Sequence, residues 1–379
     1  MSEETTSGAT TEAFVAEGPT VRRWAPSPEF WAGRRVLVTG HTGFVGTWAA
    51  RWLQHLGAQV SGASLPAQIV SDYSDQITED AGIASHAVDI TDAAALGSVI
   101  ETCQPEFVLH LAGIEGQARA ARDPAQAFAV NAAGTVNLLN ALRDLPELKA
   151  VLVVTSDCIY RPTERDGGSI EDDPLAGGDA YAASKAACDL AVESFGQSWF
   201  EPRGVAVGRA RGGALIGGGD YSPESLTLSL IRGAESGKPV VVCDPGLTRP
   251  WLHVVDGVAG YLAYLEALVS RPETPRVLNF GPPPGTRPVT LAELAGAALD
   301  ALGSNQGWLE EPADSRAGLR HAILDTSAAY AVLGIDCALD ADQAIAWAAD
   351  WRRAVAWGAD PASVTVAQIQ AYPALARDG

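Results

Sequence analysis

The chain has 379 residues, of which 46 are Asp or Glu and 26 are Lys or Arg, so its formal charge is −20 at pH 7. Such a charge argues against nucleic acid or an anionic membrane surface as a partner, and any anionic ligand needs a local basic pocket. The hydrophobic fraction of 47% is enough for one large α/β domain with an added lobe, or for two modest domains.

The sequence predicts neither a membrane span nor a secretory leader. No window approaches ~18 uninterrupted apolar residues. Residues 1–28 form a polar tail that lacks the basic start and apolar run of a signal peptide. The five cysteines are an odd number without C-x-x-C spacing, which fits reduced thiols in a cytoplasmic protein better than disulfides or zinc. We therefore expect a cytoplasmic protein without a metal site.

The first strongly patterned segment predicts a dinucleotide-binding turn. A short apolar strand over residues 35–39 stops at a glycine-rich turn, and residues 44–57 then have helical spacing before a second strand at residues 59–64. In such a turn the glycines allow a tight bend, a close approach of the pyrophosphate to the backbone and close helix packing. The expected cofactor-binding residues here are Gly40, Thr42, Gly43, Phe44, Val45, Gly46 and Ser64.

The strand and helix pattern then repeats. Residues 87–90, 107–112 and 151–156 each predict a further strand, and this alternation is typical of a Rossmann-type, doubly wound parallel sheet in an α/β protein. Asp89 is placed to receive the adenine amino group, although it fits a helix N-cap equally well. Further cofactor contacts are expected from Asp89, Ile90, Leu111 and Ala112.

The choice between NAD and NADP rests on charges near the second strand. No acidic residue closes that strand, so the usual NAD signature is missing. However, no Lys or Arg occurs between Arg51 and Arg119, and a 2′-phosphate without a nearby cation is costly to bind. Only Arg34 or Arg35 offers a local cation, so the sequence favours NAD.

A tyrosine and a lysine predict redox chemistry. Tyr181 precedes Lys185 by four residues, which puts both on one helix face, and Ser156 ends a strand 25 residues before the tyrosine. We expect the ammonium to hold the phenol pKa well below its ordinary value near ~10. The phenolate then takes a proton from a substrate hydroxyl while the carbon gives hydride to a nicotinamide. By itself a Tyr-x-x-x-Lys pattern fits a solvated surface pair, but the upstream turn and serine favour the redox role.

The second half is predicted to interleave with the first. Residues 205–209 should return as a strand of the sheet, and a turn cluster follows at residues 217–220. The expected organisation is a polar tail at 1–28, an NAD-binding domain at 29–211 to which 251–283 return, and a smaller C-terminal substrate-binding lobe made of 212–250 and 284–379.

Taken together, these motifs resemble the extended short-chain dehydrogenase/reductase superfamily, in particular NAD-dependent nucleotide-sugar epimerases and dehydratases. The group that the chain resembles most is that of the CDP-glucose 4,6-dehydratases. The resemblance runs from about residue 29 to the end and lies in residues 38–44, 62–66, 154–157, 180–185, 216–220, 248–253, 279–282 and 365–372.

The resemblance implies a three-step reaction on a nucleotide-diphosphate sugar. C4 of the hexose is oxidised by NAD with Tyr181 as base, water is eliminated across C5 and C6, and hydride returns to C6. The acid that protonates the departing hydroxyl is Asp157. The next residue is Glu or Lys in these families but Cys158 here. A thiolate at Cys158 could act as the base, or the side chain is a small buried hydrophobe.

The resemblance also implies arginines that bind the diphosphate. Arg211, Arg249 and Arg316, with Arg209 as a further possibility, are the expected substrate-binding cations. For Arg249 the alternative is a loop cation that caps Asp256. Two departures concern the same site, because Ala214 stands where an Asn is usual and Ala118 where an Arg is usual.

Three functions follow from these expectations. The first is the 4,6-dehydratase, and the second is an epimerase that oxidises C4 transiently without elimination. The third is a cofactor-binding protein without catalysis, which would predict damage to the intact Ser156, Tyr181 and Lys185 set. A homodimer is also expected, through apolar helix faces at residues 129–139 and 187–195 that can pair into a four-helix contact.

Overall fold

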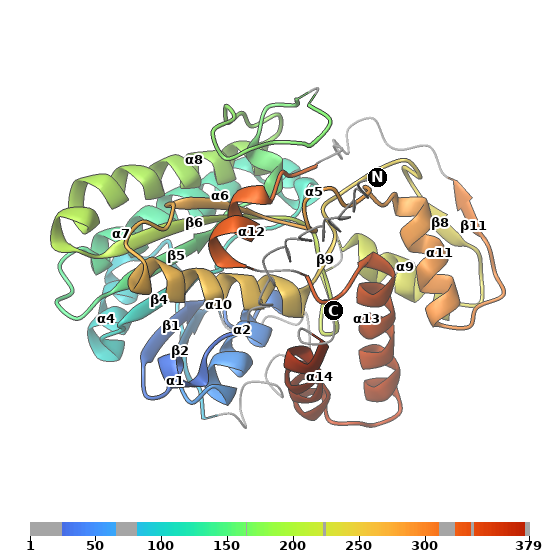
Figure 1. Ribbon diagram of the computed structural model, residues 1–379, viewed down its shortest axis with the longest axis horizontal. Coiled ribbons are helices and arrows are strands. Elements are labelled where there is room, and N and C mark those ends of the chain that lie inside the picture. Colours follow the sequence, from blue (N-terminus) through green and yellow to red (C-terminus); the bar gives the residue numbers. More distant parts are fainter. Residues whose placement is uncertain are drawn as a thin grey trace, which may run out of the picture.

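A seven-stranded parallel sheet forms the centre of the molecule (Figure 1), with the strand order β10-β6-β5-β4-β1-β2-β3. The computed structural model describes residues 25–65, 82–163, 165–222, 225–310, 323–334 and 337–375. The strands of the sheet are β1 (Arg35–Thr39), β2 (Gln59–Ser64), β3 (Ala84–Ala87), β4 (Phe107–His110), β5 (Ala150–Val154), β6 (Ala206–Gly212) and β10 (Val277–Phe280).

The central strands form because their side chains are apolar on both faces. In β1, Val36 and Val38 enter one hydrophobic core while Leu37 enters the other, and β4 and β5 alternate in the same way. A strand buried on both faces needs a continuous apolar run, which is what residues 35–39 and 150–154 provide.

Helices cover both faces of the sheet. One core is closed by α2 and α10, and the other by α4, α7 and α8 (Figure 1). The helices that belong to the sheet domain in sequence are α1 (Pro28–Trp31), α2 (Phe44–His55), α4 (Ala93–Cys103), α5 (Gln117–Arg122), α6 (Pro124–Phe128), α7 (Thr135–Leu142), α8 (Ala180–Phe195) and α10 (Val254–Ser270). The predicted Rossmann-type α/β fold is confirmed.

A smaller lobe lies beside the sheet, to the right in Figure 1. It has its own hydrophobic core, to which Leu230, Val240, Leu294 and Ile345 contribute. Its elements are α9 (Leu226–Glu235), β8 (Val240–Val242), α11 (Leu291–Ala301), β11 (Trp308–Glu310) and α13 (Ala341–Ala356). A short parallel pair of β7 (Leu215–Ile216) and β9 (Leu252–His253) stands between lobe and sheet.

Two late helices pack against the sheet domain and not only against the lobe. In α14 (Pro361–Leu375), Tyr372 is fully buried and its ring lies 5.4 Å from that of Trp52 in α2. In α12 (Ser327–Leu333), Leu333 belongs to the same core as α10. The chain therefore crosses between lobe and sheet more often than the predicted boundaries imply, and those boundaries stay a prediction.

Among the described residues, no helix is long and apolar enough to cross a membrane.

The buried carboxyl of Glu266 in α10 makes stability depend on pH. It accepts hydrogen bonds from the Trp31 indole at 2.6 Å and from the Ser27 amide at 2.9 Å, and burial raises its pKa to about 7. A pKa raised by folding means that the folded protein binds this proton more tightly than the unfolded chain. The resulting stabilisation is complete below the unfolded pKa and is lost as the pH rises through about 7.

We expect the free energy of unfolding to fall by up to about 3 kcal/mol between pH 4.5 and 7.5 through this group. Glu266→Gln should remove that part of the pH dependence while it keeps both hydrogen bonds. Urea unfolding at several pH values measures the slope. Glu101→Gln, on the exposed side of α4, is the matched control, and an unchanged slope in Glu266→Gln would contradict the assignment.

Candidate active site

The predicted cofactor turn follows β1 and packs against the end of β4. Gly40 has a φ of +74°, and a Cβ there would stand 2.8 Å from the Ala112 nitrogen. A Cβ on Gly46 would stand 2.0 Å from the Gly40 carbonyl oxygen. Both positions therefore require glycine, one for its backbone angle and both for space. The turn leads into α2, with Gly43 at its N-cap and Phe44 and Val45 in its first turn.

A histidine that the sequence reasoning did not single out ties this turn to the neighbouring strands. The His41 ring contacts Ser64 through Nδ1 at 2.9 Å and Ser85 through Nε2 at 2.8 Å. Ser64 also accepts a hydrogen bond from the Thr42 amide at 3.3 Å. The ring fits because residue 62 is glycine, where a Cβ would come within 2.2 Å of it. The sequence marks this histidine only by its place in the glycine-rich turn.

The other predicted cofactor residues lie along the same edge of the sheet. Leu111 and Ala112 follow β4, and their amides donate to Thr39 Oγ1 at 3.2 Å. The exposed Asp89 accepts from the Thr91 amide and hydroxyl at 2.8 Å, and Ile90 is buried in the core. The alternative of an N-cap role for Asp89 is wrong, because the N-cap of α4 is Asp92.

The predicted redox residues meet at the ends of β5 and α8. The Tyr181 hydroxyl lies 3.4 Å from Ser156 Oγ. Lys185 is on the same face of α8, buried beside the loop that follows β4, where a Cβ on Gly113 would stand 3.1 Å from its ammonium nitrogen. This glycine therefore leaves room for the Lys185 ammonium. Asp179 begins α8 by accepting from the Ala182 amide.

The protonation of Tyr181 differs from the expectation. Burial raises its pKa well above the ordinary value of 10, with further contributions from Cys158 and Glu115. The predicted pKa below 10 is thus wrong for Tyr181, because burial disfavours the charged phenolate.

Asp157 and Arg249 form a buried ion pair beside these residues. Arg249 Nε donates to Asp157 Oδ2 at 3.0 Å, and Nη2 donates to Oδ1 at 2.9 Å. Asp157 lies in the short helical turn after Ser156, and Arg249 lies in the loop between β8 and β9. The alternative in which Arg249 caps Asp256 is not the contact found, since both donors reach Asp157.

The surroundings of Cys158 favour the protonated thiol over the thiolate. Burial raises its pKa to about 12, and the charge of Asp157 adds to the rise. Its Sγ lies 3.6 Å from Asp157 Oδ1. At neutral pH the side chain is therefore protonated, which argues against its action as a base.

The predicted substrate arginines have different surroundings. Arg211 is buried in β6, where its guanidinium contacts Asp189 at 2.8 Å and 3.0 Å and the Tyr160 hydroxyl at 2.8 Å. Arg209 also contacts Asp189, at 2.9 Å. These guanidiniums face the interior and hold α8 against β6. The substrate-binding role of Arg211 stays a prediction. Arg316 lies outside the described residues.

Two carboxylates near the site were not anticipated. Glu115 is exposed on the loop after β4, and its charge acts on Tyr181 and Tyr261. Asp220 ends the glycine turn at 217–219, and burial raises its pKa to about 6. A carboxyl with a raised pKa, such as that of Asp220, is a candidate for proton transfer. In the sequence each of them is marked only as an acidic residue next to a glycine, in Glu115-Gly116 and in Gly219-Asp220.

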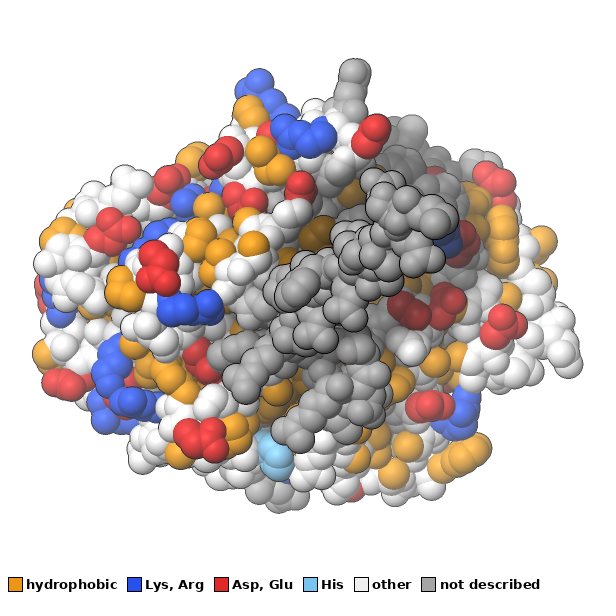
Figure 2. Space-filling model, in the orientation of Figure 1, with side chains coloured by type: hydrophobic (Ala, Val, Ile, Leu, Met, Phe, Trp, Pro, Cys, Tyr) orange, Lys and Arg blue, Asp and Glu red, His pale blue; other side chains and the backbone are white. Residues whose placement is uncertain are grey.

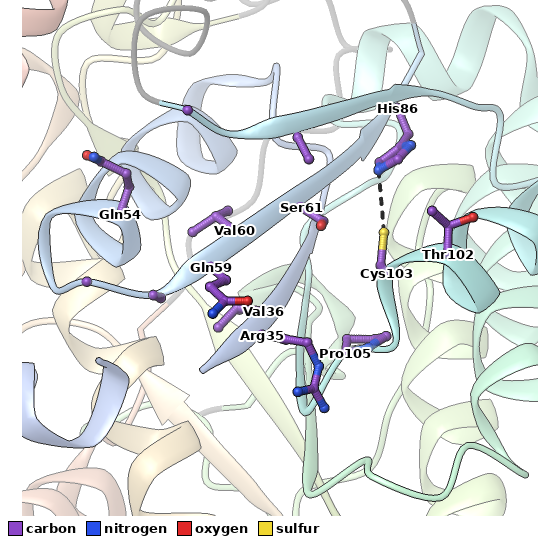
Figure 3. Close-up of a pocket in the computed structure, with 14 residues that line it drawn as sticks. Arg35, Val36, Gln54, Gln59, Val60, Ser61, His86, Thr102, Cys103 and Pro105 are labelled. Atoms are coloured by element: carbon purple, nitrogen blue, oxygen red, sulfur yellow. Dashed lines mark hydrogen bonds between the residues drawn. The ribbon is translucent and has the colours of Figure 1, made fainter. Parts of the chain in front are cut away.

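A cavity of about 620 Å³ lies at the opposite end of the strands (Figure 3). Its lining includes Ser61, His86 and Cys103, with the last two 3.4 Å apart. The guanidinium of Arg35 at its rim donates to the Gln104 carbonyl and pairs with Glu106. This cavity is at the amino ends of β1 and β2, away from Ser156 and Tyr181, so it is not the predicted reaction site.

Surface charge is mixed on the face seen in Figure 2. Lys and Arg side chains are interspersed with Asp and Glu over the described part of this face. A buried cation such as Arg249 is therefore a better candidate for recognising an anionic ligand than any surface patch in this view.

Comparison with known proteins decides the family. A model of the NAD dependent epimerase/dehydratase family matches residues 36–281. The chain belongs to this family. The match confirms the predicted membership and NAD as the cofactor, and the glycine cradle at Gly40 and Gly46 fits the close approach of such a dinucleotide.

Two curated relatives have similar length. The chain is 32% identical over 311 residues to a CDP-glucose 4,6-dehydratase of Salmonella typhimurium, which covers 80% of this chain and 86% of the relative. It is 30% identical over 322 residues to a dTDP-glucose 4,6-dehydratase of Streptomyces griseus, which covers 83% of this chain and 93% of the relative.

Solved structures agree on the fold. A UDP-glucose 4-epimerase of Thermotoga maritima with UDP-glucose has a TM-score of 0.73 at 19% identity, over 85% of this chain and 99% of its own. A UDP-glucose 4-epimerase of Thermus thermophilus with NAD has a TM-score of 0.71 at 22% identity, over 83% of this chain and 98% of its own. At these identities the likeness concerns the fold alone.

The buried carboxylate of Asp189 is expected to stabilise the site. Asp189→Ala leaves Arg209 and Arg211 without their shared counter-ion, so we expect the free energy of unfolding to fall by about 3–5 kcal/mol. Urea unfolding followed by tryptophan fluorescence measures it. Glu193→Ala is the control, because Glu193 also pairs with Arg209 but its side chain is 40% exposed, and its loss should cost at most about 1 kcal/mol. Equal effects in the two variants would contradict the structural role.

Proposed function

We propose that the chain is an NAD-dependent nucleotide-sugar 4,6-dehydratase. The observation that carries this proposal is a buried carboxylate, Asp157, which contacts Ser156 Oγ at 3.2 Å and lies close enough to Tyr181 for its charge to act on the phenol. Transient oxidation at C4 needs only the serine, tyrosine and lysine, whereas elimination of water needs an additional acid. The two curated relatives named as 4,6-dehydratases, at 30% and 32% identity over most of both chains, support the same reaction.

The redox residues have distinct tasks in this proposal. Ser156 Oγ and the Tyr181 hydroxyl, 3.4 Å apart, would bind the C4 hydroxyl between them. Tyr181 must first release its own proton to solvent, because burial raises its pKa, and the phenolate then takes the proton of the C4 hydroxyl. The Lys185 ammonium lies on the same helix face and stabilises the phenolate that forms. Oxidised NAD, when bound, would supply the hydride acceptor.

Elimination requires one acid and one base. Asp157 gives a proton to the departing C6 hydroxyl, the C6–O bond breaks, and water leaves, while the C5 proton goes to the base. Cys158 is a poor base, because burial raises its pKa to about 12. Glu115 is the carboxylate that we propose for this task, since it is exposed on the loop beside Lys185 and its charge acts on Tyr181.

An epimerase is the second candidate function. It uses the same Ser156, Tyr181 and Lys185 set and returns hydride to C4, so it needs neither C5 chemistry nor an acid. The observation in its favour is Cys158, which stands where the dehydratases that the chain resembles have Glu or Lys. The carboxylate of Asp157 is then without a catalytic task.

Purified protein incubated with CDP-, dTDP-, GDP- and UDP-sugars is expected to convert one of them to a product lighter by one water. Tyr181→Phe should keep its fold and its NAD but lose at least ~10²-fold in turnover, because it cannot accept the C4 proton. Mass spectrometry of the products and absorbance of bound NAD measure both. A product of unchanged mass and altered stereochemistry would indicate the epimerase, and near-normal turnover of Tyr181→Phe would remove the redox assignment.

Solvent deuterium tests the choice of base. A dehydratase incorporates deuterium at C5 during turnover, and we expect Glu115→Gln to slow this incorporation by at least ~10²-fold. Cys158→Ala is the matched control, and it should leave incorporation within a few-fold of the wild type because its thiol carries its proton throughout. If Cys158→Ala slowed the incorporation strongly and Glu115→Gln did not, Cys158 would be the base.

The chain also pairs with a second copy in this proposal. Phe128 in α6, Leu190 in α8 and Trp199 just after α8 are 41%, 55% and 42% exposed. They lie on or beside the helix faces at 129–139 and 187–195, and α6 packs on α8. Exposed apolar residues clustered on adjacent helices are typical of an interface between protein chains.

Light scattering at micromolar concentration should give the mass of a dimer. Leu190→Arg places a charge in the proposed helix contact and should shift the mass toward that of the monomer. Trp357→Arg provides the control, because Trp357 is 81% exposed just after α13 in the lobe. A wild-type monomer, or a dimer that both variants leave intact, would contradict this interface.

A further inference from the structure

The ion pair of Asp157 and Arg249 conflicts with the role of Asp157 as an acid. The guanidinium contacts both carboxylate oxygens, at 2.9 Å and 3.0 Å, in a fork that matches the carboxylate plane. The Asp157 side chain is 2% exposed and that of Arg249 is 13% exposed. Because both oxygens accept from the guanidinium, the carboxyl has no proton to donate in this arrangement, whereas an acid must carry a proton before it can give one away.

Arg249 is at the same time the described cation best placed for a diphosphate. Arg209 and Arg211 are held by Asp189 on the interior side of β6. Arg249 belongs to a loop of the lobe and reaches across to the turn after β5, so its guanidinium lies at the reaction site. One cation therefore has two competing anions, the carboxylate of Asp157 and the diphosphate of the sugar nucleotide.

We propose that the diphosphate of the substrate draws Arg249 away from Asp157, and that Asp157 then takes up a proton from solvent and becomes the acid of the elimination. This inference rests on the proposed dehydratase function. The physical reason is the burial of the carboxyl, because an unpaired charge in this environment is costly and protonation removes it. Arg249 meanwhile exchanges its two hydrogen bonds to a carboxylate for hydrogen bonds to the diphosphate, so the free energy of its ionic contacts changes little.

The proton account closes over one turnover. Binding adds one proton from solvent to the carboxylate, and elimination transfers that proton to the C6 hydroxyl as the C6–O bond breaks and water leaves. The carboxylate that remains regains Arg249 when the product and its diphosphate dissociate. The acid is thus formed only in molecules that hold a substrate.

Other titratable groups around Asp157 do not gain this proton. Burial raises the pKa values of Cys158, Tyr181 and Tyr261, so these three already carry their protons at neutral pH. The buried His110 stays neutral, since burial and the Lys185 charge lower its pKa to about 3. Two carboxylates remain as competitors, Glu115 on the loop after β4 and Asp220 after the glycine turn, and both serve as controls in the test.

Calorimetric titration with CDP, dTDP, UDP and GDP tests the inference without turnover, because these nucleotides carry the diphosphate but no sugar. The number of protons taken up follows from the binding enthalpy in buffers of different ionisation enthalpy at pH 7.5. We expect an uptake of about one proton per site in the wild type, and none in Asp157→Asn. We further expect Asp157→Asn to bind the diphosphate about tenfold more tightly, because Arg249 is no longer engaged by a competing anion.

The controls separate this inference from its alternatives. Glu115→Gln and Asp220→Asn should keep the proton uptake of the wild type, and its loss in either variant would assign the proton to that residue. Binding without proton uptake in the wild type would overturn the coupling and leave the dehydratase proposal standing. Failure of all four nucleotides to bind would overturn the proposed substrate class and the coupling together. The wild-type measurement decides the question even where Asp157→Asn does not fold.

Discussion

The arrangement of the site depends on one buried carboxylate, Asp189. From the middle of α8 it holds Arg209 and Arg211 of β6 and accepts a hydrogen bond from Thr155, the residue before Ser156. Three separate parts of the chain are thereby fixed to one another: the helix with Tyr181, the strand end with Ser156 and the last strand before the lobe. The cluster holds together the elements that carry the tyrosine and the serine, whose hydroxyl oxygens lie 3.4 Å apart. An apolar residue at 189 would pack equally well but leave two interior guanidiniums uncompensated.

The fold was predictable because its signals are local. Residues 35–64 contain a strand, a glycine turn and a helix in an order that few other structures allow. The four-residue spacing of Tyr181 and Lys185 places both on one helix face, which follows from helix geometry alone. The partners that charged side chains contact in the folded protein were not predictable in this way. An arginine such as Arg211 has the same appearance in sequence whether it faces a ligand or an interior carboxylate. Its partner Asp189 is 22 residues away and no motif marks it.

The same limit applies to protonation. The spacing of Tyr181 and Lys185 gives the sign of one electrostatic effect, but burial of the phenol works in the opposite direction and depends on everything packed around it. Glu115 was missed for a related reason. An acidic residue in a loop carries no signal in the sequence, and its effect on Tyr181 follows only from the fold. For Cys158 the sequence left the thiolate and the buried thiol open, and its surroundings favour the thiol.

The return of α14 to the sheet domain has a consequence for how the molecule can move. Tyr372 lies against Trp52, while the same helix also packs on α13 of the lobe. Helix α14 therefore packs on both the sheet domain, through α2, and the lobe, through α13. A movement of the lobe away from the sheet would separate α14 from one of its two partners, and removal of the lobe together with α14 would expose Trp52. An opening between lobe and sheet must therefore either carry α14 along with one of them and break its packing on the other, or leave both contacts in place and move only the loops.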